Sequence, residues 1–152
     1  MAQITGALSA VNALVEYSAN GTSWTDVSGT YNKISPGGST RKYGFKYTFD
    51  GDTAIITYGK REPIEITFTF IYTEGASDVY KTLEDLHVAE DGTAFYMRWA
   101  PKGATVGNFV YSTGSCKIVS WNRPEIDSES ADPLVVEFTV ACSNITRSTY
   151  TT

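Results

Sequence analysis

The side chains that most often do chemistry in proteins are scarce in this sequence. His87 is the only histidine, and Cys116 and Cys142 are the only cysteines. A structural zinc site takes about four cysteine or histidine ligands, so these three residues fall short of one. A serine or cysteine nucleophile needs an adjacent base, which His87 alone would have to supply, and no G-x-S-x-G pattern presents a nucleophile. We therefore expect no enzymatic activity and no cofactor.

Two acidic stretches could still gather oxygen ligands around a calcium ion. Asp127, Glu129 and Asp132 have a suitable spacing, and so do Asp50 and Asp52. Neither stretch matches an EF-hand loop, and acidic, serine-rich loops are usually solvated, so we expect no metal. Because a chain of this size needs no disulfide framework, the two cysteines are expected to be free, buried thiols rather than a bonded pair.

The overall charge of the chain limits its partners. The 152 residues, with a mass of 16.6 kDa, include 12 basic and 17 acidic side chains, which gives a net charge of -5 and a pI near 4.8. Such a chain should not bind DNA or an anionic membrane by bulk charge, although a surface that DNA must pass without sticking would also be acidic. Residues 1–10 contain no basic residue and no continuous apolar block, and no segment approaches a membrane span of about 18 apolar residues. We expect no secretory signal, no membrane and synthesis in the cytoplasm.

Alternation of apolar and polar residues, the pattern of a half-buried strand, is the strongest structural signal. It runs over residues 64–72 and again over residues 134–142. The apolar positions of both segments should face a core. The opposite positions are mostly short and polar or acidic, with Ile71 an apolar exception, and five of them stand out: Glu65, Thr67, Thr69, Glu137 and Thr139. Either a solvated sheet face or a face that lines a channel would explain this row.

A long hairpin is predicted between residues 35 and 58. Aromatic residues alternate over 43–49, a second run covers 54–58, and Asp50-Gly51-Asp52 between them is typical of a hairpin turn. The segment 35–46 is rich in glycine and basic residues. It is either a flexible loop or an arm that binds an acidic neighbour, and the contact residues would then be Arg41, Lys42, Tyr43 and Lys46.

One helix is predicted, over about residues 77–90. Ser77 and Asp78 are N-cap types, apolar residues follow at helical spacing up to Val88, and Gly92 provides a stop. His87 would then lie in the last turn, where a cation suits the helix dipole.

Shorter strands are expected at 14–17, 24–27, 95–99 and 106–121, the last with a break at Gly114. These elements predict a mainly β fold in a single domain over residues 1–152: an antiparallel β-sandwich or partial barrel with one helix, a long hairpin loop and extended termini at 1–10 and 143–152.

The order of these elements and their turn chemistry resemble the major tail tube protein of long-tailed, siphovirus-like bacteriophages. The resemblance runs from about Trp24 to about Cys142. The stretches that carry it are Ser23-Trp24-Thr25-Asp26-Val27-Ser28-Gly29, Gly59-Lys60-Arg61-Glu62-Pro63-Ile64-Glu65-Ile66, Tyr72-Thr73-Glu74-Gly75-Ala76-Ser77-Asp78, Trp99-Ala100-Pro101-Lys102-Gly103 and Pro124-Glu125-Ile126-Asp127 before Asp132-Pro133.

The resemblance implies a structural virion protein that forms hexameric rings, stacked into the tube through which DNA leaves the capsid. Part of each sandwich would join a continuous inner barrel with the polar row toward the lumen, and the helix would pack outside. The hairpin loop and both terminal arms would bind neighbours. Implied partners are other copies of the chain, the tail terminator, tape measure and distal tail proteins, and DNA in transient passage; the implied location is the virion tail.

An alternative from another class is an aromatic-rich carbohydrate-binding or adhesion sandwich. Trp24, Trp99 and Trp121 could stack on sugars if they were exposed, with calcium bound at residues 127–132.

Overall fold

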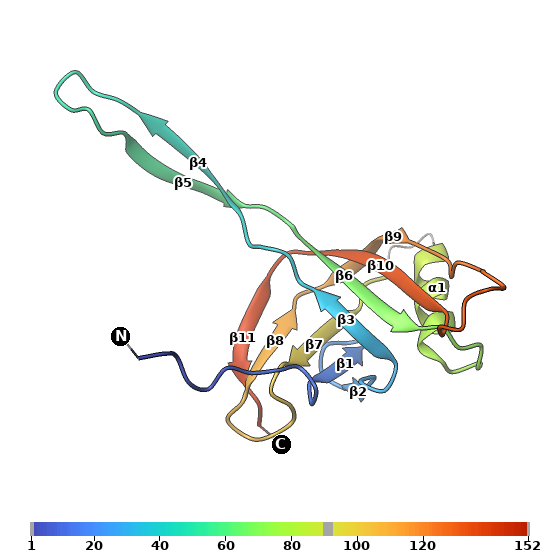
Figure 1. Cartoon of the computed structure of the whole chain (residues 1–152). Coiled ribbons are helices and arrows are strands. Elements are labelled where there is room, and N and C mark those ends of the chain that lie inside the picture. The colour runs from blue at the N-terminus through green and yellow to red at the C-terminus, as the bar shows by residue number, and fades with distance from the viewer. Residues whose placement is uncertain (1, 90–92, 152) are drawn as a thin grey trace.

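Two antiparallel β-sheets face each other across the core, in a computed structural model that describes residues 2–89 and 93–151 (Figure 1). The five-stranded sheet has the order β11 (Ile145–Thr149), β8 (Phe109–Thr113), β7 (Tyr96–Ala100), β1 (Leu14–Ser18) and β2 (Thr25–Asp26). The four-stranded sheet has the order β3 (Tyr31–Ser35), β6 (Ile64–Ile71), β10 (Val135–Cys142) and β9 (Cys116–Trp121). A separate ribbon pairs β4 (Arg41–Lys46) with β5 (Ile55–Arg61). The prediction of a mainly β, antiparallel sandwich is confirmed.

The core forms where the alternating strands β6 and β10 lie side by side. Their register pairs Phe68 with Phe138, whose rings stack at 5.3 Å, and both side chains are fully buried. Trp99 of the other sheet meets Phe68 edge-on at 6.3 Å, so the two sheets share one apolar layer. Burial of each large apolar side chain contributes about 1.5–3 kcal/mol, which explains why the alternation of β6 and β10 is so strict.

Helix α1 (Val79–Val88) closes one end of the sandwich next to β9 (Figure 1). Leu83 is buried, and Tyr80 packs against Trp121 with ring centroids 5.5 Å apart. His87 lies in the last turn, as predicted, and its ring stacks on Trp121 at 6.2 Å. In the part of the chain that the structure describes, no helix is long and apolar enough to cross a membrane.

The helix differs from the prediction at both ends. It begins at Val79 after the N-cap residue Asp78, whose carboxylate accepts a hydrogen bond from the Gly75 backbone N–H at 2.9 Å instead of capping the helix. Val88 is exposed, because its position turns away from the sheets. The expected stop at Gly92, like residue 90, lies outside the described residues.

The two cysteines are free and buried, as predicted. They lie directly opposite each other on β9 and β10. Burial raises the pKa of the Cys116 thiol to about 12 and also raises the pKa of Cys142, so both thiols stay protonated at neutral pH.

The C-terminal segment corrects one expectation. Residues 143–152 were expected to form an extended arm, yet residues 145–149 form β11, which pairs with β8 over its full length. Two further backbone hydrogen bonds join Tyr150 to Gly107 and Asn108. The segment is ordered by its own chain, because β8 offers an edge whose backbone groups would otherwise lack partners.

Candidate assembly surfaces

The hairpin of β4 and β5 projects away from both sheets, with its tip far from the core (Figure 1). Every residue of the two strands is exposed. The turn lies between residues 47 and 54, as the Asp50-Gly51 signal predicted. A lone two-stranded hairpin is at best marginally stable in water, so an arm of this length would gain stability from a partner surface.

One face of the hairpin is apolar and aromatic. The register pairs Tyr43 with Tyr58 and Phe45 with Ile56, so these four side chains share a face, which we call the aromatic face. Tyr58 is 82% exposed, and the other three are more than half exposed. Tyr47 extends the row by packing edge-on against Phe45 at 6.0 Å. Contiguous exposed apolar side chains of this kind mark an interaction surface.

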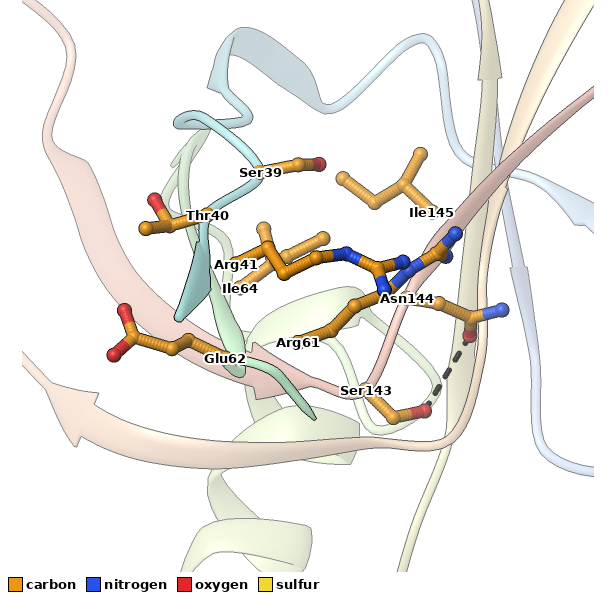
Figure 2. Close-up of a pocket in the computed structure, with 9 residues that line it drawn as sticks. All are labelled: Ser39, Thr40, Arg41, Arg61, Glu62, Ile64, Ser143, Asn144 and Ile145. Atoms are coloured by element: carbon orange, nitrogen blue, oxygen red, sulfur yellow. Dashed lines mark hydrogen bonds between the residues drawn. The ribbon is translucent and has the colours of Figure 1, made fainter. Parts of the chain in front are cut away.

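An open pocket of about 350 Å³ lies at the root of the hairpin, next to the start of β11 (Figure 2). We call it the root pocket. Arg41 and Arg61 are directly opposite each other across the two strands, and their guanidinium groups point the same way, beside Asn144 (Figure 2). The Glu62 carboxylate points away from them (Figure 2). The root pocket therefore presents two positive charges together.

The structure places the four predicted contact residues, Arg41, Lys42, Tyr43 and Lys46, on one exposed strand, β4. Whether they bind a neighbour stays a prediction. The predicted contact residues did not include the β5 residues that lie across from β4 on the same surface: Ile56, Tyr58 and Arg61. The alternation after the Asp-Gly turn could have shown that these side chains continue the same surface.

The five residues of the predicted polar row share one face of the four-stranded sheet. Thr67 and Thr139 are register partners whose hydroxyl oxygens lie 3.2 Å apart, and Thr69 pairs with Glu137. Glu65 lies on the same face, opposite Ala141. We call this surface the polar face. It points away from the core, since the alternate residues of β6 and β10 are buried.

The polar face is less acidic than β6 and β10 alone suggested. Register places Lys33 of β3 beside Thr69, and Lys117 of β9 beside Ala141. Two lysines therefore accompany the two glutamates. The short hydroxyl side chains in the middle of the face are joined by Ser35 and Ser120. The polar face is therefore close to neutral in charge.

Residues 2–13 form an extended segment with no helix or strand. Ile4, Leu8 and Val11 on this segment are largely exposed. The segment therefore has little core of its own and adds apolar surface outside the sandwich.

The tryptophans do not form a platform for sugars. Trp99 and Trp121 are only 8% and 9% exposed, because they belong to the core. Arg98 covers the ring of Trp24 at 4.4 Å and is itself held by Glu16 at 2.9 Å. The carbohydrate-binding alternative thus loses the observation on which it rested.

The acidic loop expected to hold calcium in that alternative shows no gathered ligands. The Asp127 carboxylate accepts a hydrogen bond from the Glu129 backbone N–H at 3.0 Å. Over residues 2–89 and 93–151, no three aspartate, glutamate, histidine or cysteine side chains come together as metal ligands would.

The chain has the fold of phage-tail-like tube proteins. A chain of the PVC sheath–tube complex, an extracellular contractile injection system in the extended state, matches with a TM-score of 0.74 at 12% identity, covering 94% of this chain and 92% of that chain. A chain of the tube-terminating cap of the anti-feeding prophage matches with a TM-score of 0.73 at 13% identity, covering 98% and 95%. The SPP1 tail tube matches with a TM-score of 0.62 at 12% identity, covering 96% and 81%. No protein-family model and no curated protein matches the sequence, so the likeness lies in the fold.

Proposed function

We propose that this chain is the structural subunit of a tail tube, in which hexameric rings stack into a conduit for DNA. The observation that carries the proposal is the combination of a tube-protein fold with a projecting, fully exposed hairpin. Contiguous exposed apolar surface of this kind marks an interaction site, and a subunit of a polymer requires such sites.

In this proposal the polar face lines the lumen, with Glu65, Thr67, Thr69, Glu137 and Thr139 toward the DNA. The opposite face of the same sheet is filled by the core and by α1, which leaves the polar face as the free one. Strands β3 and β9 are the edges of this sheet. Pairing of β3 with β9 of the next subunit would satisfy the edge backbone groups and close the sheet into a ring.

A near-neutral, hydroxyl-rich wall suits passage of DNA. Phosphate binding by proteins depends mainly on clustered lysine and arginine side chains, whose charge is balanced on this face by the two glutamates. DNA would then slide past hydrated side chains without being held. The role is structural and requires no catalytic residue.

The hairpin and the segment 2–13 would contact neighbouring subunits, with Arg41, Lys42, Tyr43 and Lys46 in the hairpin contact. The tail terminator, tape measure and distal tail proteins would meet the tube at its ends or within it. Matches to the anti-feeding prophage cap and to the PVC sheath/tube terminator support such end partners. The assembled protein would reside in the virion tail after synthesis in the host cytoplasm.

Negative-stain electron microscopy of the concentrated protein, combined with sedimentation velocity, tests the proposal. We expect rings or tubes whose amount rises steeply with protein concentration, because each added subunit buries the exposed hairpin of another. A protein that stays monomeric at every concentration would contradict the proposal.

A further inference from the structure

Charge is distributed unevenly along this chain. Residues 41–61, the hairpin, carry five basic and two acidic side chains, which leaves seven basic and fifteen acidic residues in the rest of the chain. The exposed loop between β9 and β10 is strongly acidic. Residues 125–132 contain four carboxylates and no basic side chain, and we call them the acidic loop: Glu125, Ile126, Asp127, Ser128, Glu129, Ser130, Ala131 and Asp132.

The root pocket holds two cations that oppose each other. Like charges directly opposite on antiparallel strands are destabilising, and Arg41 faces Arg61 in this way. Arg41 is in contact with the Tyr58 ring at 5.6 Å. Among the residues described, neither guanidinium forms an ion pair. A carboxylate entering the root pocket would relieve the repulsion and could take two charge-assisted hydrogen bonds.

The acidic loop has the complementary character. All of its residues are exposed, and Ile126 at its start is 88% exposed, beside Asp127. In residues 2–89 and 93–151 none of its four carboxylates is paired with a basic side chain. The acidic loop thus offers carboxylates, which complement Arg41 and Arg61, and the exposed apolar side chain of Ile126, which complements the aromatic face.

The root pocket and the acidic loop cannot meet within one chain. The acidic loop lies before Val135, the first residue of β10. The root pocket includes Ser143 and Asn144, which lie after Cys142, the last residue of β10. The eight residues of β10 are fully extended between them and span about 24 Å. Figure 1 shows the loop between β9 and β10 at the end of the molecule opposite the hairpin.

We propose that the root pocket binds the acidic loop of a second copy of this chain, with Arg41 and Arg61 holding carboxylates from Asp127 and Glu129 and with Ile126 against the aromatic face. The contact is head-to-tail, so each copy keeps one free pocket and one free loop, and association continues. This inference rests on the proposed function and adds one specific pair of surfaces to the contacts between subunits.

A charge-swap experiment tests this contact. Variant one carries Arg41→Glu and Arg61→Glu; variant two carries Asp127→Arg and Glu129→Arg. Each variant alone should need at least about tenfold more protein to associate than wild type, as measured by sedimentation velocity. In each variant the side chains at positions 41 and 61 carry the same charge as those at positions 127 and 129, which they would meet. An equimolar mixture should associate again, because each reversed surface meets its complement. A mixture that stays as dissociated as the separate variants overturns the inference.

A matched control reverses two cations elsewhere, with Lys81→Glu and Lys102→Glu giving the same change in net charge as variant one. It should associate as wild type does; if it fails equally, net charge and not the root pocket is responsible. Should variant one associate normally but bind double-stranded DNA more weakly, the arginines serve a phosphate backbone and the inference is wrong. Association by the swapped mixture without tubes in the micrographs would support this contact while contradicting the tail-tube proposal. If neither wild type nor the mixture associates, both are wrong.

Discussion

Glu65 and Glu137 show how much a single position on the polar face matters. Both lie on the free side of the four-stranded sheet, which also bears Lys33 and Lys117. The two glutamates are what keep this face from becoming a basic surface. In the proposed tube the same residues would recur in every ring, so a small change in the charge of each polar face would be repeated along the whole lumen.

We predict that Glu65→Lys combined with Glu137→Lys makes assembled tubes retain DNA. The polar face would then carry four lysines and no glutamate, and clustered cations bind phosphates. The measurement is co-sedimentation of tubes with short double-stranded DNA at low salt. Binding should weaken steeply as salt is raised.

The control for that measurement is Glu74→Lys with Asp85→Lys, two exposed carboxylates of which Glu74 precedes α1 and Asp85 lies within it, paired with Lys81. Tubes of the control variant should bind much less DNA. Equal retention by both variants would count against assigning the polar face to the lumen.

The second prediction at the residue scale concerns Cys116 and the stability of the fold at alkaline pH. Burial raises its pKa from 9.0 to about 12 in the folded chain, so the unfolded chain loses the thiol proton first. The free energy of unfolding should therefore fall as pH rises from about 9 toward 12, by up to about 1.4 kcal/mol per pH unit for this group. Urea unfolding of Cys116→Ala should show a shallower decline over this range. If the free energy of unfolding falls equally steeply with pH in both proteins, burial of Cys116 does not affect alkaline stability. The raised pKa values of Tyr17 and Tyr31 contribute to the decline that remains in Cys116→Ala.

Among the elements, the hairpin is separable from the rest of the fold. None of its residues belongs to the buried core, and at its base the Glu62 backbone N–H donates to the Thr40 carbonyl at 2.9 Å. The strands β3 and β6, which flank the hairpin in the sequence, pair with each other within the sandwich. The sandwich should thus fold without the projecting arm.

We predict that replacing residues 41–61 by Asn-Gly leaves a folded protein that no longer polymerises. A two-residue turn of this type fits the backbone pair at Thr40 and Glu62. Thermal unfolding by circular dichroism should remain cooperative with little change in midpoint, while electron microscopy should show no tubes. The companion variant Tyr43→Ser with Tyr58→Ser keeps the hairpin and removes half of the aromatic face, and it should assemble poorly as well. Normal tubes from the excised protein would remove the hairpin from the assembly mechanism.

At the scale of the whole molecule, the proposed contact between the charged surfaces would give open-ended association. The basic hairpin root and the acidic loop lie at opposite ends of β10. A self-complementary patch would close a dimer, whereas two different surfaces at opposite ends continue a chain of subunits.

The C-terminal strand limits which parts of the molecule are free for neighbours. Because β11 completes the five-stranded sheet, its backbone groups on one side are already used. The N-terminal segment 2–13, the hairpin and the acidic loop extend from the sandwich, so in the proposed assembly they are the elements that reach another subunit.

The sequence alone determined the strands in which apolar and polar residues alternate regularly. Residues of β6 and β10 alternate with a period of two, apart from the apolar pair Ile71 and Val135, because one side of each strand packs in the core and the other faces solvent. The break at Gly114 between β8 and β9, the hairpin turn and the helix were predicted on similar local grounds. The shared side of Glu65, Thr67 and Thr69 follows from the same period.

Only the tertiary structure decided which strands become neighbours. A bulge between Tyr31 and Lys33 interrupts the alternation of β3, and β11 is a polar edge strand, so neither was recognisable from its own residues. The pairing of β3 and β9 with the central strands brought Lys33 and Lys117 onto the polar face, and the hairpin register set Arg41 opposite Arg61. Strand partners and register depend on contacts between segments far apart in the chain, and no local periodicity encodes them.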